Sequence, residues 1–196
     1  RGGISLVIDI QNSIKAQESR GYEHWAKIHN LKQAARTLNF LTENRIDSYA
    51  ELSAKIAEVN AASEQAAGSL KGVERRLADM AVLIKNVSTY QKTKPVYEAY
   101  RAAKDKAAYR AAHESSLILF EAAAKAVKPA LIGGKLPNVA ALQAEYAALG
   151  EQKEKLYADY GKLKKQVKEY DVIKRNIDSI LRRESEPEQG KENVRG

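Results

Sequence analysis

The sequence contains no cysteine, only four prolines, few aromatic residues and no long apolar run. The lack of cysteine excludes a disulfide-stapled scaffold and fits a reducing compartment, so we expect a cytoplasmic protein. The uninterrupted apolar stretches are short, such as residues 117–120, whereas a membrane-spanning helix needs roughly 18 to 20 apolar residues. The sequence therefore predicts no membrane partner.

What is present is a basic chain of 196 residues, with 33 Lys and Arg against 25 Asp and Glu and a net charge of +8. This length allows one large or two small domains. The positive excess makes nucleic acid a reasonable class of partner. The chain starts with Arg1 and shows no signal peptide, so we expect a fragment of a longer protein.

Glycine and proline concentrate at a few places, including Gly21, Pro95 and residues 129–137. The stretches between them are rich in Ala, Leu, Glu, Lys, Gln and Arg, which are strong helix formers. The sequence therefore predicts an all-α protein.

Two stretches repeat apolar residues in alternating steps of four and three, and ten of the twelve positions in each are apolar or tyrosine. A period of 3.5 residues held over more than five heptads is typical of a coiled-coil seam. The first stripe is Leu52, Ile56, Val59, Ser63, Ala66, Leu70, Val73, Leu77, Met80, Ile84, Val87 and Gln91. The second stripe is Leu142, Tyr146, Leu149, Lys153, Leu156, Tyr160, Leu163, Val167, Tyr170, Lys174, Ile177 and Leu181.

The two stripes have equal lengths, about 58 Å each at roughly 1.5 Å per residue. This equality predicts an intramolecular antiparallel hairpin, with Leu52 opposite Leu181 and Gln91 opposite Leu142. Because the chain fills its own seam, we expect a monomer; a dimeric coiled coil is the less favoured alternative.

Local chemistry predicts where the helices begin and end. Asp47 or Ser48 caps the first long helix and Asn138 caps the second. Pro95 is expected to stop the first long helix and to open a short one that ends near residue 103. A further helix is expected over residues 107–127.

Two amphipathic helices are predicted before the hairpin, over residues 4–17 and 22–43. The second should pack near Leu52 and Ile177 through one apolar stripe. Its members are Trp25, Ile28, Leu31, Ala35, Leu38 and Leu41.

These elements define a domain organisation. Residues 1–46 form an N-terminal helical pair at the base of the hairpin. Residues 47–183 form the antiparallel coiled-coil hairpin, with a short helical cap at its tip over about residues 94–137. Residues 184–196 form a disordered polar tail.

The sequence offers little for catalysis. His24 and His29 are five residues apart and His113 lies in another element, so they do not form a metal site at helical spacing. No glycine-rich phosphate loop and no nucleophile grouping occur. We therefore expect no metal, no cofactor and no enzymatic activity for this chain.

The positive charge is concentrated at the two ends of the predicted hairpin. Residues 94–137 carry eight basic and four acidic groups, and residues 1–46 carry seven basic and four acidic groups. In residues 94–137, cations alternate with tyrosines, a combination that can bind phosphates and stack on exposed bases. In the alternative interpretation, the tyrosines pack the tip and the cations are solvated. The candidate nucleic-acid-binding residues are Lys94, Arg101, Lys104, Lys106, Arg110, Tyr97, Tyr100 and Tyr109. Two further basic clusters are Lys27, Lys32 and Arg36, and Lys162, Lys164, Lys165 and Lys168.

Several segments resemble the region that follows the nuclease domain in relaxases, the mobilisation proteins of conjugative plasmids and integrative elements. They include residues 8–11, 21–27, 30–32 and 37–41, residues 90–94 with Tyr97, Tyr100 and Arg101, and residues 136–137, 142–146 and 176–178 with Leu181. The resemblance covers about residues 4–183. Relaxases nick DNA with a nucleophile and a histidine-bound metal, and this chain lacks that histidine cluster.

The resemblance implies a non-catalytic C-terminal module that assists DNA binding or positioning at the transfer origin during plasmid or transposon mobilisation. DNA is the expected partner, and accessory or coupling proteins of conjugation are further candidates. The alternative is a structural coiled-coil module that contacts such accessory or coupling proteins.

Overall fold

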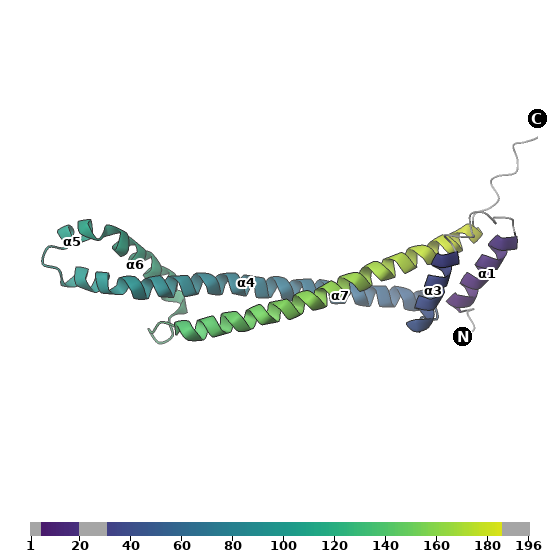
Figure 1. The fold of residues 1–196 in the computed structure, drawn as a ribbon, viewed down its shortest axis with the longest axis horizontal. Helices are drawn as coiled ribbons and strands as arrows, with labels where there is room; N and C mark the ends of the chain where they lie inside the picture. The colour runs from purple at the N-terminus through teal and green to yellow at the C-terminus, as the bar shows by residue number, and fades with distance from the viewer. Residues whose placement is uncertain (1–4, 20–30, 186–196) are drawn as a thin grey trace, which may run out of the picture. The chain divides into compact units, whose positions relative to one another are not determined.

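The structure, a computed structural model, describes residues 5–19 and 31–185. This part of the chain is helical, as Figure 1 shows, and contains no β-strand beyond a single bridge between Ile132 and Lys135. The predicted all-α class is confirmed. The helices are α1 (Leu6–Ser19), α3 (Leu31–Glu43), α4 (Tyr49–Ala102), α5 (Lys106–Ala112), α6 (Glu114–Val127) and α7 (Val139–Ser185), with a 3₁₀ turn at Lys128–Ala130.

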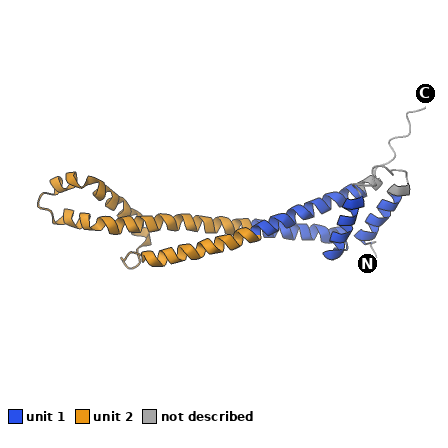
Figure 2. Cartoon of the chain, in the orientation of Figure 1, with its two compact units in different colours: residues 1–65, 160–196 blue, residues 66–159 orange. Residues whose placement is uncertain are grey.

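The chain divides into two compact units, which Figure 2 colours separately. Unit 1 comprises residues 1–65 and 160–196, and unit 2 comprises residues 66–159. The long helices α4 and α7 each contribute one segment to both units. The predicted disordered tail covers residues 184–196, but residues 184 and 185 belong to the end of α7. Residues 186–196 lie outside the described residues.

Helices α4 and α7 pack against each other and run antiparallel. In unit 2, the Lys153 ammonium lies 3.8 Å from the Glu74 carboxylate, and the Arg76 guanidinium lies 3.6 Å from the Glu145 carboxylate. The residue number on α7 thus falls as the residue number on α4 rises. This direction is the one that the hairpin prediction requires.

The buried sides of the two long helices are the predicted stripes. Eleven of the twelve stripe positions on α4 are buried or half-buried, with Gln91 as the exception. The same holds for eleven of the twelve positions on α7, with Tyr146 as the exception. The 3.5-residue period therefore identifies which side of each helix packs.

The register between α4 and α7 differs from the predicted one. The predicted register would place residue 184 opposite Tyr49, but the Tyr49 hydroxyl donates a 2.8 Å hydrogen bond to the Asp178 carboxylate, six residues earlier. The Glu74–Lys153 ion pair is displaced in the same direction by six residues, and the Arg76–Glu145 pair, whose side chains are longer, by twelve. A shift close to one heptad keeps the same stripes in contact, so the period alone does not determine which heptads meet.

The core of unit 1 lies where α1 and α3 pack on the ends of α4 and α7. The ring of Phe40 meets the ring of Tyr170 edge-on, with centroids 5.0 Å apart. The expectation that the second N-terminal helix packs near Leu52 and Ile177 is confirmed, because Ala34, Phe40 and Leu41 of α3 share this core. The buried members of this core are Leu6, Ile10, Ala34, Phe40, Leu41, Ile46, Leu52, Ile173, Ile177 and Ile180.

The side of α3 that faces this core matches the predicted stripe only in part: Leu41 is buried in the core and Leu38 packs against it. Leu31 and Ala35 are exposed, whereas Ala34 and Thr37 are buried. The Thr37 hydroxyl can be buried because it donates a 2.7 Å hydrogen bond to a backbone carbonyl one turn earlier. A count of apolar residues alone misses this threonine. The first two members of the predicted stripe lie outside the described residues.

The start of α4 shows which of the two predicted caps is used. The Ser48 hydroxyl accepts a 3.1 Å hydrogen bond from the Glu51 amide, and the Glu51 carboxylate accepts one of 2.8 Å from the Asp47 amide. This reciprocal arrangement resembles a capping box. Asn138 caps α7 as predicted, because its side-chain oxygen accepts a 3.2 Å hydrogen bond from the Ala141 amide.

Pro95 does not stop α4, and the prediction that it would is wrong. The helix continues to Ala102 with Pro95 inside it. Proline removes one backbone hydrogen bond and disfavours a helix interior, but Tyr97, in the following turn, stacks on Phe120 of α6 at 4.3 Å. Tertiary packing beyond the proline thus offsets the local cost.

The predicted helix over residues 107–127 is two helices. Asp105 caps α5 through a 3.1 Å hydrogen bond from the Ala108 amide. His113, with φ −126° and ψ 27°, separates α5 from α6. The non-helical backbone at His113 lets the chain change direction between the two helices.

Candidate nucleic-acid interface

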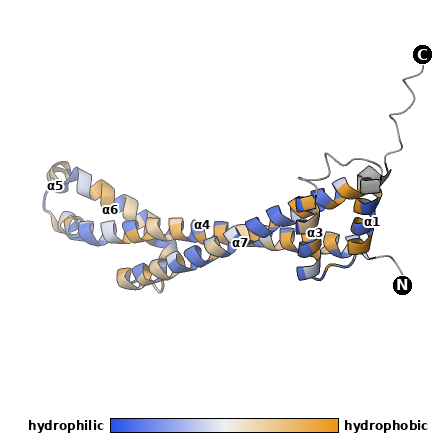
Figure 3. Cartoon of the chain, turned by 45° about the vertical axis from the view of Figure 1, so that its right-hand side comes forward, coloured by the Kyte–Doolittle hydropathy of each residue, from blue (hydrophilic) through white to orange (hydrophobic). Residues whose placement is uncertain are grey.

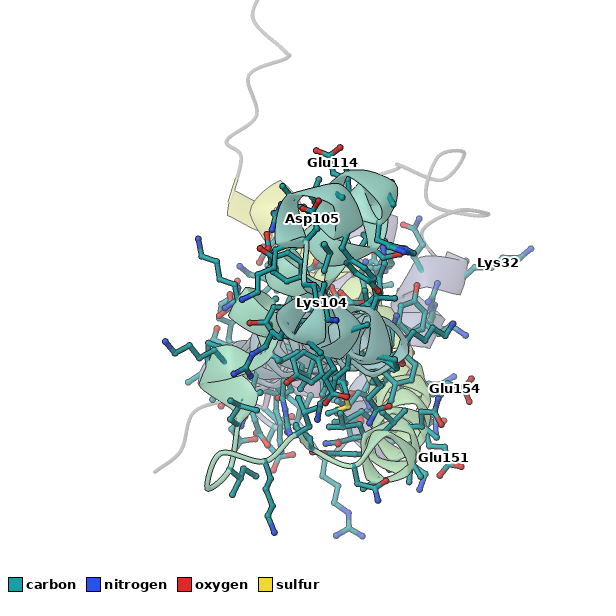
Figure 4. All side chains as sticks on the ribbon, turned by 90° about the vertical axis from the view of Figure 1, so that its left-hand side faces the viewer. Lys32, Lys104, Asp105, Glu114, Glu151 and Glu154 are labelled. Carbon is teal, nitrogen blue, oxygen red and sulfur yellow. The ribbon has the colours of Figure 1, made fainter. Side chains whose placement is uncertain are left out.

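Three cations lie around the turn between α4 and α5, and we refer to them as the turn cations. Arg101 is in the last turn of α4, Lys104 is in the connection and Lys106 begins α5. All three side chains are exposed, and within the described residues none of them forms an ion pair. Figure 4 looks toward this turn and labels Lys104 beside the capping residue Asp105. Exposed, unpaired cations on a short turn are free to contact an anionic partner.

Arg110, another candidate, is already bound within the protein. Its guanidinium donates two hydrogen bonds to the Glu121 carboxylate, at 3.0 and 3.2 Å, and lies 5.8 Å from the centre of the Tyr100 ring. Hydrogen bonding to Glu121, and secondarily to Tyr100, raises the pKa of Arg110 above its ordinary value. Arg110 therefore joins α5 to α6, and its charge is partly neutralised.

Lys94 is also paired, although weakly. Its ammonium lies 4.0 Å from the carboxylate of Glu98, one turn further along α4. Both side chains are more than half exposed, so water screens the pair and a phosphate could displace Glu98. Lys94 belongs to the same basic region but contributes less free charge than the turn cations.

The three candidate tyrosines form part of one continuous aromatic cluster. Tyr97 stacks on Phe120, with ring centroids 4.3 Å apart and planes inclined by 18°. Tyr100 lies 6.3 Å from Tyr97 and 6.4 Å from Tyr109, centroid to centroid. The three tyrosines are half-buried, and Tyr97 uses a ring face to stack on Phe120. These contacts favour the interpretation in which the tyrosines pack.

The cluster extends to residues that the sequence analysis did not select. Tyr90 contacts Phe120 at 4.9 Å, and Tyr109 contacts His113 at 4.3 Å. The spacing of Leu117, Phe120 and Val127 on α6 is a helical stripe that could have identified Phe120 as buried. No sequence signal connects Arg110 with Glu121, because the two lie on different helices.

The other basic clusters lie on surfaces without aromatic neighbours of this kind. Lys32 and Arg36 are exposed on α3, and Lys27 lies outside the described residues. The four lysines at positions 162–168 are exposed on α7, and the Lys164 ammonium lies 5.4 Å from the centre of the Tyr160 ring. Both clusters lie on the sides of helices and not around a turn between two helices.

Residues 5–19 and 31–185 contain no group of three or more His, Cys, Asp or Glu side chains placed to hold a metal ion. His24 and His29 lie outside these ranges. None of the described helices is long and apolar enough to span a membrane.

Comparison with models of known protein families, with curated proteins and with solved structures finds no match for this chain.

Proposed function

We propose that this chain is a non-catalytic helical module that binds DNA through the turn cations, as the C-terminal part of a conjugative relaxase. The observation that carries the proposal is the exposure of Arg101, Lys104 and Lys106 around the turn between α4 and α5, without an ion-pair partner among the described residues. Around them, residues 94–137 carry twice as many basic as acidic groups. This excess favours an anionic partner.

The arrangement of the tyrosines indicates how the DNA would be held. Since Tyr97 stacks on Phe120 and Tyr109 lies against His113 in a tilted contact, their rings are not free to receive bases on both faces. Contacts to phosphates then supply most of the affinity, and such contacts carry no sequence information themselves. A module of this kind positions DNA and leaves sequence recognition to another part of the protein.

The assignment to a relaxase is supported by the resemblance of about residues 4–183 to the region after the nuclease domain. The same resemblance implies work at the transfer origin during mobilisation. The nicking chemistry would belong to the rest of such a protein, because the catalytic histidine cluster of the family has no counterpart in this sequence.

Fluorescence anisotropy with labelled single-stranded and duplex oligonucleotides tests the proposal. We expect binding at low salt that weakens steeply as salt is added. The triple variant Arg101→Ala, Lys104→Ala and Lys106→Ala should bind at least tenfold more weakly, because it loses up to three phosphate contacts.

A matched control removes the same number of positive charges from α7. The variant Lys162→Ala, Lys165→Ala and Lys168→Ala changes the net charge equally but leaves the turn intact. We expect it to retain most of the affinity. Equal losses in the two variants would reject the turn as the site. No binding by the unmodified chain at low salt would reject DNA binding and favour the protein-interaction alternative.

A further inference from the structure

Helix α6 has apolar side chains on two opposite sides. Leu117, Phe120, Ala123 and Val127 are buried against the rest of unit 2. A second set points away from them, and Figure 3 shows orange, hydrophobic turns along this helix. Contiguous exposed apolar side chains with a polar rim are typical of an interaction surface. The exposed side of α6 therefore has the composition of an interface.

The exposed set forms a stripe at helical spacing, which we name the outer stripe. It consists of Ile118, Leu119, Ala122 and Ala126. Ile118 is 52% exposed and Leu119 is 53% exposed, although both are large and apolar. Ala122 and Ala126 follow at successive turns and are also exposed. Their small side chains leave room for the large residues of a facing helix.

One edge of the outer stripe carries an acidic residue at one end and a basic residue at the other. Glu114 and Lys125 are eleven residues apart, close to three full turns, so they lie on the same edge. Within the described residues, neither forms an ion pair. Figure 4 shows the Glu114 side chain projecting away from the helices of unit 2.

We propose that the outer stripe is a self-association surface, on which α6 packs antiparallel against α6 of a second copy of this chain. An antiparallel two-fold pair brings the same edge of both helices together. Glu114 of each copy then meets Lys125 of the other, twice per dimer. A parallel pair would bring the charged edge against the opposite edge and leave both charges without a partner.

The apolar residues fit the same arrangement. With Glu114 opposite Lys125, the two-fold axis passes between residues 119 and 120. The two Leu119 side chains then lie next to the axis. Ala122 of one copy lies within one residue of the level of Ile118 of the other, so a small side chain faces a large one.

The outer stripe is separate from the turn cations and from the α4–α7 stripes. The expectation of a monomer concerned the α4–α7 stripes, which the chain fills by itself, whereas the outer stripe lies on α6. The turn cations are not part of it, so self-association does not depend on DNA binding.

Sedimentation equilibrium over a range of concentrations tests the association. For the unmodified chain of 21.7 kDa, the average mass should rise toward twice this value as the concentration approaches roughly 0.5 mM, as expected for a small interface. Leu119→Asp should keep the mass at that of a monomer. Val82→Asp is the matched control, because Val82 is 59% exposed on α4, and it should not change the association.

Charge reversal tests the antiparallel arrangement. Glu114→Lys alone and Lys125→Glu alone should each weaken the dimer by about two- to tenfold, and the double reversal should restore it. Circular dichroism should show equal helicity in all variants, since the substituted side chains are exposed. A monomer at every concentration, or a double reversal that does not restore a weakened dimer, would overturn the proposal.

Discussion

Arg45 illustrates how a single backbone conformation joins two helices. Its φ of 54° is the left-handed conformation that side chains other than glycine rarely adopt. The Ile46 amide donates to the Leu41 carbonyl at 2.9 Å, and the Arg45 amide donates to the Thr42 carbonyl at 3.2 Å. This pair of bonds is the Schellman motif that ends many helices. Its hydrophobic contact is supplied by Leu41 and Ile46, both buried.

Replacing Arg45 with glycine should therefore stabilise the protein. Glycine adopts positive φ without steric cost, so we expect the free energy of unfolding to rise by up to about 1 kcal/mol. Urea denaturation followed by circular dichroism measures the change. Arg45→Ala removes the same charge but keeps a Cβ atom and should give no gain. A loss of stability in the glycine variant would contradict this account of the turn.

The ion pair between Arg110 and Glu121 restrains a charge that could otherwise contact DNA. Glu121→Gln should release the guanidinium and tighten DNA binding, and it should steepen the dependence of log Kd on log salt by about 0.7 to 0.9 per added phosphate contact. Glu151→Gln is the control, because it removes one negative charge from α7 without releasing an arginine. Identical effects of the two variants would mean that only net charge matters.

At the scale of the element, the apolar period predicts the fold class and the packed side of each long helix. It does not predict the register, because moving α7 by one heptad brings equivalent positions together again. The contacts of Tyr49 with Asp178 and of Glu74 with Lys153 depend on tertiary structure. Local rules also misplace the end of α4, since they do not include the stacking of Tyr97 on Phe120.

Pro95 should destabilise α4, and its removal should show by how much. Alanine restores the backbone hydrogen bond that proline lacks, so Pro95→Ala should raise the free energy of unfolding by up to about 3 kcal/mol. Pro129→Ala is the control, because Pro129 lies in the first turn of a 3₁₀ helix, where proline is tolerated. It should give no gain. Thermal unfolding of the two variants side by side makes the comparison.

Burial should determine the cost of truncating the α7 stripe. Ile177 is fully buried where α1, α3 and α4 meet α7, so Ile177→Ala should cost about 2 to 5 kcal/mol of stability. Ile8→Ala makes the same chemical change at a side chain that is 46% exposed and should cost much less. Similar losses measured by urea denaturation would contradict the described core.

At the scale of the molecule, the sequence predicts a charge distribution, and the structure shows how that charge is used. The basic excess in residues 94–137 could be counted directly. The sequence does not show which of these cations are paired. Arg110 contacts Glu121 only because the helix is interrupted at His113, so that α5 packs beside α6. The aromatic residues were predicted as a base-stacking surface or as packing, and the contacts of Tyr97 and Tyr109 favour packing.

The slope of log Kd against log salt, compared between the unmodified chain and the triple variant of the turn cations, tests the central claim most directly. If Arg101, Lys104 and Lys106 neutralise phosphates, the magnitude of the slope should fall by about two to three in the variant. Equal slopes for the two proteins would contradict the claim that this turn holds the DNA.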